Sequence, residues 1–275
     1  MRQIDTGTED LLANVDDGVA TLTMNRPDRR NAMSGPMNQA LARVLAEVEV
    51  ADDVGCVVLT GAGGAFCAGG DVKGMASGGD GGAGSAPIGY DARVHRQRLN
   101  QRAVSQRLYE MPKPTIAALP GAAAGAGLSM ALACDLRYAV PTAVLTTAFA
   151  KVGFAGDYGG TWFLTRLVGS AKAREMYFFS DKVTASEAER LGLVNAIFPA
   201  ETFEQGVADR ARQLAHGPTV AYRYMKENLN RAVHGELGEC LDMEAAHHIR
   251  TGQTDDHNEA AKAFVEKRTP VFHGR

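Results

Sequence analysis

The sequence predicts an α/β protein built on a parallel sheet with helices on its face. Three successive segments carry this prediction. Val19–Met24 alternates apolar with small or polar residues as a strand does, an apolar-periodic helix follows Ser34, and Cys56–Thr60 is a second apolar strand. A strand, a helix and a strand in that order imply a crossover between parallel strands. The chain has 275 residues, 45% of them hydrophobic, enough for one large domain or for one domain with a small appendage.

The first helix has a cap and a clear apolar face. Ser34 is a suitable N-cap residue. The residues of its apolar face recur at helical spacing: Met37, Leu41, Val44, Leu45 and Val48. The turn before it, Asn25–Asn31, is rich in arginine, which fits either a solvated loop or a phosphate contact by Arg29 or Arg30.

Two loops rich in glycine and alanine give the strongest indication of a site. Gly121–Asp135 begins as a small-residue turn and continues as a buried helix, so free N–H groups and the positive end of the helix dipole face outward. Ala65–Asp71 follows the strand Cys56–Thr60 and is a second loop of the same kind. Each loop alone fits tight packing equally well, but two of them can direct two amides at one carbonyl oxygen.

The segment between these loops has three parts. Ala76–Gly89 is low in complexity and predicts a mobile loop, which is either a lid over the pocket or an insertion without a role. A helix rich in arginine and glutamine follows over 94–110, and we interpret it as solvated surface or a subunit contact. Pro112 and Pro114 end it, and Thr115–Leu119 is a buried strand.

The second half begins with short strands at 135–140 and 144–148. Gly156–Gly160 is a tight turn that contains Asp157, and a helix starts at Thr161 and is predicted to end near Gly169. An aspartate in such a turn is most often a turn former or a helix cap. From the residues alone, Asp157 therefore has both a structural and a catalytic interpretation.

The C-terminal part is predicted to be mainly helical. Thr184 and Glu187 form a capping box for a helix that Gly192 stops, and a short strand follows over 193–198. Amphipathic helices are predicted over Glu201–His216 and Thr219–Val233, with a further helix after Asp255. These helices have more apolar surface than a small appendage can bury, which favours an oligomer interface.

Composition excludes several classes of function. A net charge of −3 and a pI near 6.2 give no general case for nucleic-acid or membrane binding. The four cysteines form no C-x-x-C pair, and the histidines show no ligand spacing, so we expect no metal site and no disulfide framework. The polar N-terminus and the absence of a long apolar run predict a soluble, cytoplasmic protein.

Over nearly its full length the sequence resembles the crotonase superfamily, the enoyl-CoA hydratase/isomerase family. The matching stretches are NRPDRRNAM (25–33), VVLTGAGGAFCAGGDVK (57–73), PGAAAGAGLSMALACDLRYA (120–139), GDYGGTWFLTRLVG (156–169), ASEAERLGLVN (185–195) and AFVEKRTPVF (263–272). The resemblance implies a spiral of β-β-α repeats over residues 1–200, a helical trimerisation region over 201–275, and trimers or pairs of trimers. It also implies acyl-CoA thioester substrates and no cofactor other than the coenzyme A of the substrate.

The resemblance also implies catalytic residues. Two main-chain N–H groups form the family's oxyanion hole, and they map here to Ala68 and Ala126. Hydratases of the family use two glutamates to hold water, and the matching positions are Ser129 and Phe149, which cannot act as carboxylates. Asp157 occupies the turn where family isomerases and a dehalogenase relative have an aspartate. The GG-T-W sequence that follows Asp157, residues 159–162, resembles the turn of the phenylacetate-pathway isomerases.

For coenzyme A, the family places the nucleotide and the pantetheine near the first loop and the arginine-rich turn. The candidate contacts are Arg29, Ala65, Ala68, Gly69, Gly70, Asp71, Val72, Gly127, Phe264 and Lys267. Phe264 and Lys267 are expected to reach the nucleotide of a neighbouring subunit, although Lys267 fits a solvated surface equally well. Asp71 has a competing role as the cap of a following helix.

These assignments predict an isomerase. Asp157 would remove an acidic proton from an enoyl-CoA and return it two carbons along, while the two amides hold the dienolate oxygen. Phe149, Phe154, Trp162 and Phe163 would make the pocket apolar and raise the pKa of the acid, although core packing explains most of them equally well. Three alternatives remain open: hydration with water held by Asp157, attack of Asp157 on an aryl-CoA carbon, and acyl-CoA binding without catalysis.

Overall fold

The α/β class is confirmed by a computed structural model, which describes residues 1–71, 74 and 89–275. Among these residues a seven-stranded sheet has the order β1-β2-β3-β4-β6-β8-β11. β1 and β2 pair antiparallel and β2 pairs antiparallel with β3, whereas every later neighbour is parallel. The strand bounds are β1 Arg2–Ile4, β2 Leu11–Asp16, β3 Val19–Met24, β4 Cys56–Gly61, β6 Thr115–Leu119, β8 Leu136–Ala139 and β11 Ala196–Ile197.

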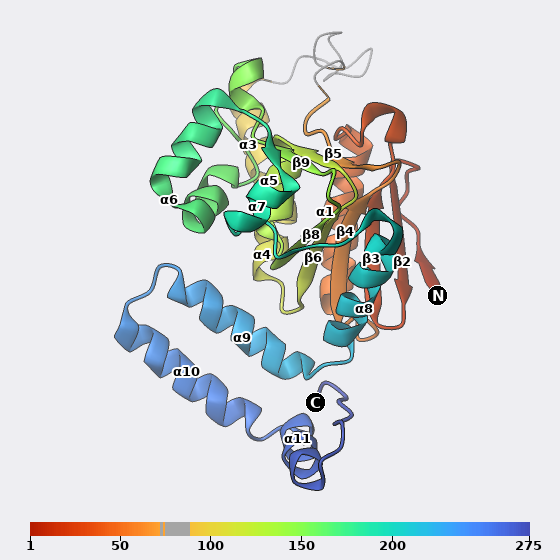
Figure 1. Cartoon of the computed structure of the whole chain (residues 1–275), viewed down its shortest axis with the longest axis vertical. Helices are drawn as coiled ribbons and strands as arrows, with labels where there is room; N and C mark the ends of the chain where they lie inside the picture. Colours follow the sequence, from red (N-terminus) through yellow and green to blue (C-terminus); the bar gives the residue numbers. More distant parts are fainter. Residues whose placement is uncertain (72–73, 75–88) are drawn as a thin grey trace.

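Helices cover both faces of this sheet (Figure 1). α1 (Gly35–Val50) lies on one face, and its expected cap is present, because Ser34 Oγ accepts a hydrogen bond from Met37 N at 3.1 Å. α8 (Phe203–Ala215) lies on the other face, with Val207 and Ala211 in the core. α8 therefore packs with the sheet, and the boundary predicted at residue 200 stays a prediction.

A second, four-stranded sheet has the order β10-β9-β7-β5 within the described residues. Its strands are β5 (Ala65–Cys67), β7 (Ala122–Ala124), β9 (Val144–Thr146) and β10 (Val183–Thr184). Residues 65–67 and 122–124 were expected to belong to loops, which is wrong. Runs of two or three residues are too short to show a strand periodicity, so only the pairing of β5 with β7 reveals them.

The helical segment before β6 is continuous but changes its winding. It comprises α3 (Tyr90–Gln101), the π-helical η2 (Arg102–Gln106) and α4 (Arg107–Glu110). α5 (Ala126–Ala133) is buried throughout. α6 (Gly160–Phe179) consists of two helical stretches that meet at a kink, because Gly169 has a non-helical φ of 78° and ψ of 162°. The first stretch therefore ends near Gly169, as the sequence predicts, and a second stretch continues to Phe179.

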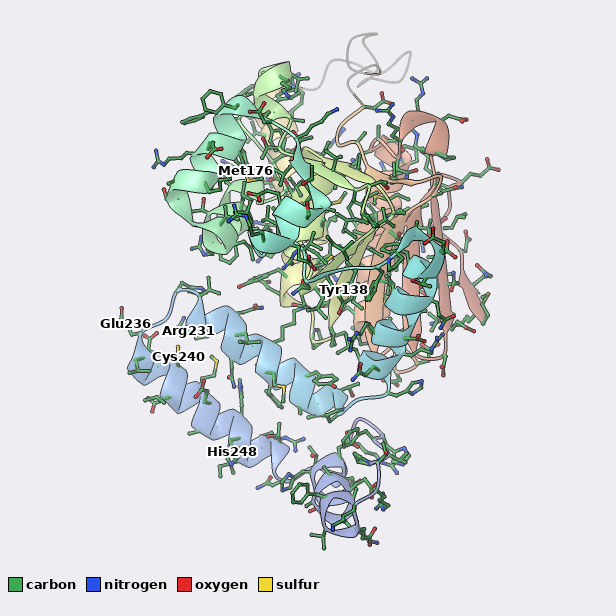
Figure 2. The ribbon with its side chains drawn as sticks, viewed as in Figure 1. Tyr138, Met176, Arg231, Glu236, Cys240 and His248 are labelled. Atoms are coloured by element: carbon green, nitrogen blue, oxygen red, sulfur yellow. The ribbon has the colours of Figure 1, made fainter. Side chains whose placement is uncertain are left out.

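The last helices lie apart from the sheets. α9 (Thr219–Ala232) and α10 (Leu237–Thr251) form an antiparallel pair, and α11 (Asp255–Glu266) follows at the far end of the molecule (Figure 1). Figure 2 shows Tyr138 and Met176 in the main body, whereas Arg231, Cys240 and His248 lie on the helical pair. The remaining short elements are η1 Pro27–Arg29, η3 Phe149–Val152, α7 Ala185–Arg190 and η4 Ala200–Thr202.

One buried lysine ties α9 to the main body. Lys226 Nζ donates to Asp135 Oδ2 at 2.8 Å, to the carbonyl of Leu108 at 3.0 Å and to that of Lys113 at 3.1 Å. The ion pair and both carbonyl contacts satisfy the charge inside the protein. This anchor fixes the direction in which the C-terminal helices leave the sheet.

Two predictions fall on residues that the structure does not describe. Val72 lies outside the described residues, and so does the low-complexity loop Ala76–Gly89 apart from Gly89. In the described part of the chain, each helix is too short or too polar to cross a membrane. The same residues contain no group of three or more His, Cys, Asp or Glu side chains arranged to hold a metal ion.

Candidate active site

The small sheet brings three loops to one edge. β5, β7 and β9 are parallel neighbours, with Ala65 opposite Ala122 and Ala123 opposite Leu145. Parallel strands end at the same edge of a sheet, so the segments that follow them meet there. These segments are the loop after Cys67, the turn before α5, and the chain that leads from β9 to Asp157.

One of the two predicted oxyanion donors is wrong. The N–H of Ala68 already donates to the carbonyl of Arg30 at 2.9 Å, so it has no hydrogen to offer a ligand. Among the hydrogen bonds of the described residues, the N–H groups of Gly70 and Ala126 have no acceptor. Gly70 was expected only as a coenzyme A contact, and it replaces Ala68 as the candidate donor.

The loops that carry these two amides are in close contact. Gly69 has φ +87°, and a Cβ atom there would lie 2.9 Å from the carbonyl oxygen of Ala124 and 3.3 Å from the nitrogen of Ala126. Glycine is therefore required at this position both for the backbone conformation and for the approach of the loops. This contact places the amide of the next residue, Gly70, beside the first turn of α5.

The arginine-rich turn holds the first loop in place. Besides the bond from Ala68, the N–H of Met33 donates to the carbonyl of Gly69 at 2.8 Å. Asn31 is fully buried, and its Nδ2 donates to the carbonyls of Ala62 and Ala65, both at 2.8 Å. Sequence reasoning missed this role of Asn31, because a buried asparagine in a turn full of cations gives no local signal.

The coenzyme A candidates in this region differ in accessibility. Arg29 and Ala68 are exposed, whereas Ala65 and Gly69 are buried. The carboxylate of Asp71 is occupied: Oδ1 accepts from Gly74 N at 3.0 Å and Oδ2 from Arg26 Nη2 at 3.1 Å. The bond from Gly74, with the Arg26 guanidinium, holds the pKa of Asp71 below its usual range.

Asp157 is a partly buried acid that pairs with no cation among the residues that the structure describes. Its Oδ1 atom is buried and has no hydrogen-bond partner among the described residues. Burial raises the pKa of the Asp157 carboxyl to about 6, because the charged form is poorly solvated there. Asp157 in turn is one of the groups that raise the pKa of the Cys67 thiol, which links it electrostatically to the first loop. Such an acid can both take and release a proton near neutral pH.

Two hydroxyls and a stacked ring surround the turn of Asp157. A Cβ atom on Gly160 would lie 2.3 Å from Ser129 Oγ and 2.6 Å from Tyr177 Oη, so both hydroxyls lie against this glycine. Phe149 stacks on Tyr177 with 5.7 Å between ring centroids. Tyr177 was not among the expected residues, since it lies beyond the position where the helix was expected to end. Burial and the nearby Asp157 raise the pKa of Tyr177, which keeps its hydroxyl protonated.

The other expected contacts lie elsewhere. Gly127 is buried, and a Cβ atom there would lie 2.6 Å from that of Cys67, so this glycine serves packing. Phe264 is 86% exposed, and it lies with Lys267 at the end of the chain that is far from β5 (Figure 1). The structure therefore does not bring these two residues to the loops of their own chain.

The fold and these groups define an α/β enzyme. The sequence profile described as Enoyl-CoA hydratase/isomerase matches residues 14–275, and the chain belongs to this family of the crotonase superfamily.

Individual relatives are similar over most of their length. A 1,2-epoxyphenylacetyl-CoA isomerase of Escherichia coli (strain K12) is 36% identical over 97% of this chain and 99% of its own. A 4-chlorobenzoyl coenzyme A dehalogenase-1 of an Arthrobacter species is 34% identical over 83% of this chain and 80% of its own. The crystal structure of an enoyl-CoA hydratase from Polaromonas sp. JS666 superposes with a TM-score of 0.86 at 32% identity, covering 95% of this chain and 99% of that one.

Proposed function

We propose that this protein is an enoyl-CoA isomerase that moves a double bond, or rearranges a ring, through an enolate. The amides of Gly70 and Ala126 hold the thioester oxygen, and Asp157 removes a proton from the carbon next to the carbonyl. The electron pair of that C–H bond moves into the carbonyl and gives a dienolate. The carboxyl of Asp157 then returns the proton two carbons along, so the acid ends as it began.

One observation carries this proposal: Asp157 has a buried, unpaired carboxyl oxygen with its pKa raised to about 6. The two positions where family hydratases have glutamates are Ser129 and Phe149, and both are buried. The hydroxyl of Ser129 is also engaged, because its Oγ donates to the carbonyl of Gly125 at 3.2 Å. A single acid supports a shuttle, whereas water held between two carboxylates has no counterpart here.

The relatives support both an isomerase and a competing reaction. The Escherichia coli relative is named for the isomerisation of an acyl-CoA that carries a ring and an oxygen atom. The dehalogenase relative favours a second candidate, in which Asp157 attacks an aryl carbon of the substrate. The two reactions differ in whether a covalent aryl-enzyme species forms.

The decisive experiment measures how much deuterium from the solvent is incorporated into the substrate. Unsaturated CoA esters with the double bond at either position are incubated in deuterated water with the wild type and with Asp157→Asn. The proposal expects deuterium at the α or γ carbon with the wild type, and a loss of about 10²–10⁴-fold in the variant. Equal exchange by both proteins would remove Asp157 from the mechanism.

The same assay tests the amides and the alternatives. Ala126→Pro removes one donor at the first position of α5, where proline is tolerated, and we expect a rate loss of about 10²–10³. Ala126→Gly keeps the N–H and is the matched control. Hydration of crotonyl-CoA that disappears in Asp157→Ala, a covalent aryl-enzyme species, or binding without turnover would each replace the isomerase proposal.

We also infer that the protein works as a trimer, or as a pair of trimers, in which a neighbouring subunit supplies Phe264 and Lys267 to the nucleotide of coenzyme A. Large apolar side chains on the C-terminal helices support this, since Phe264 and Val265 are 86% and 80% exposed in the single chain. The distance of α11 from the loops of its own chain also favours contacts between subunits (Figure 1).

A further inference from the structure

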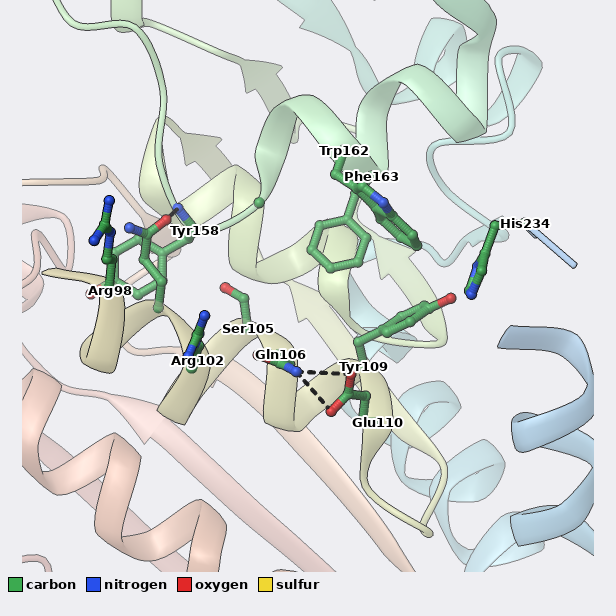
Figure 3. Close-up of a pocket in the computed structure, with 12 residues that line it drawn as sticks. Arg98, Arg102, Ser105, Gln106, Tyr109, Glu110, Tyr158, Trp162, Phe163 and His234 are labelled. Atoms are coloured by element: carbon green, nitrogen blue, oxygen red, sulfur yellow. Dashed lines mark hydrogen bonds between the residues drawn. The ribbon is translucent and has the colours of Figure 1, made fainter. Parts of the chain in front are cut away.

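A cavity of about 470 Å³ begins at Tyr158 and Gly159, directly after Asp157. One side is the helical segment from α3 to α4, and the other is the first turn of α6 (Figure 3). His234, from the turn between α9 and α10, closes one end. Neither Asp157 nor the two oxyanion candidates line it, so it extends the site away from the reacting groups.

Two hydroxyls of this cavity lack partners. Ser105 Oγ and Tyr109 Oη are buried, and neither has a hydrogen-bond partner among the described residues. Ser105 is only 3% exposed, and its hydroxyl points into the cavity in Figure 3. Buried polar atoms are normally satisfied, because an unpaired one has lost its hydrogen bonds to water without replacement. Two such hydroxyls in one cavity therefore indicate a ligand that bonds to them.

The helix is wound abnormally where Ser105 occurs. Arg102–Gln106 is a π-helix between two α-helical stretches, and it contains Ser105. A π-turn interrupts the regular hydrogen bonding of the α-helix and is found frequently at functional sites. Its position at the cavity wall is a second observation that points to a ligand.

The remaining wall is aromatic. Tyr109 and Trp162 meet edge to face at 73°, with 5.1 Å between ring centroids. Trp162 and Phe163 also meet edge to face, at 84° and 5.0 Å. A flat ring of a ligand can pack against these rings in the same edge-to-face geometry.

We propose that this cavity receives the distal end of the acyl group and selects an aromatic or other flat ring that carries an uncharged oxygen atom, bonded by Ser105 and Tyr109. The proposal rests on the proposed function, since it makes the cavity part of an acyl-CoA site. A linear chain would leave both hydroxyls unpaired. Arg98 and Arg102 also line the cavity, but both side chains are exposed, where a carboxylate gains little from an ion pair.

The test uses CoA thioethers, which have no carbonyl and no removable proton. Their binding does not depend on Asp157 or on the oxyanion amides. The ring preference can therefore be absent while the proposed reaction holds, and it can be present while the proposed reaction fails. Dissociation constants are measured by calorimetry for hydroxyphenylethyl-CoA, in its meta and para forms, for phenylethyl-CoA and for octyl-CoA. We expect the wild type to bind the better hydroxylated ring about three- to tenfold more tightly than the plain ring.

Variants connect this preference to the two hydroxyls. Ser105→Ala and Tyr109→Phe each remove one hydroxyl and should reduce the preference, and the double variant should abolish it while phenylethyl-CoA binds as before. Tyr222→Phe, a half-buried tyrosine of α9 outside the cavity, is the matched control. An octyl-CoA that binds as tightly as the hydroxylated ring, or a preference that survives in the double variant, overturns the proposal.

Discussion

At the scale of single residues, the carboxyl of Asp157 has opposite effects on activity and on stability. The burial that raises its pKa to about 6 also destabilises the folded protein whenever the group is ionised. The folded state binds the proton more tightly than the unfolded state, whose pKa is near the ordinary 3.8. Folding stability from this group is therefore complete below about pH 4 and is lost as the pH rises to 6.

We accordingly predict that Asp157→Asn is inactive but more stable than the wild type at neutral pH. The gain in the free energy of unfolding is at most about 3 kcal/mol, and less if solvent partly screens the carboxylate. Urea denaturation at pH 4 and at pH 7.5 checks this, because the gain should be present at pH 7.5 and largely absent at pH 4. Asp52→Asn, on an exposed turn, is the control, and an equal gain at both pH values would contradict the argument.

The same scale limits what the sequence predicts about the site. The sequence indicated a loop around 65–71 and the start of the buried helix as parts of a site, because both combine small residues with a following element. It could not tell which amide in the loop is free. That depends on Arg30, whose carbonyl bonds the Ala68 amide across the fold. A backbone hydrogen bond between distant segments leaves no pattern in side-chain types.

At the scale of elements, Gln101 connects α3, whose last residue it is, to the turn of Asp157. Its Oε1 accepts a hydrogen bond from the N–H of Tyr158 at 2.7 Å. Tyr158 has φ 48°, an unfavourable conformation for a residue with a side chain, so an external contact is needed to hold it. Gln101 thus acts as a positioning residue for the acid rather than as a catalytic one.

We predict that Gln101→Leu lowers kcat about tenfold with little change in KM, because the acid is held less accurately. Gln101→Glu keeps an acceptor and adds a negative charge near Asp157, so kcat should largely recover while the acidic limb of the pH profile moves to higher pH. Gln97→Leu, one helical turn earlier, is the matched control. A kcat loss in Gln101→Leu with no shift of the profile in Gln101→Glu would reduce Gln101 to a packing residue.

Elements also differ in how well the sequence predicts them. β3, α1 and β6 have long or alternating apolar patterns. The predicted bounds of β3 and β6 are confirmed, and so are the predicted cap and apolar face of α1. The second sheet was missed because β5 and β7 have three residues each, most of them alanine. Yet this short sheet positions all three loops of the candidate site. The part of the fold that matters most for function is therefore the part with the weakest local signal.

At the scale of the whole molecule, the C-terminal helices have apolar surface that the single chain does not bury. The exposed side chains are Met225, Leu229, Leu237, Leu241, Ile249, Phe264, Val265 and Val271. Such a surface on helices that stand apart from the sheets is expected to be covered by other copies of the chain. The buried anchor at Lys226 holds α9 in place for this contact.

We predict that the protein sediments with the mass of three or six chains, and that Leu229→Glu shifts it toward monomers, because a charge in an apolar interface is costly. Val50→Glu is the matched control, since Val50 is equally apolar and exposed but lies at the end of α1. If Phe264 and Lys267 act on a neighbouring subunit, the monomeric variant should also lose coenzyme A affinity while its separate chains stay folded by circular dichroism. A monomeric wild type, or a monomeric variant with full coenzyme A affinity, would show that each chain completes its own site.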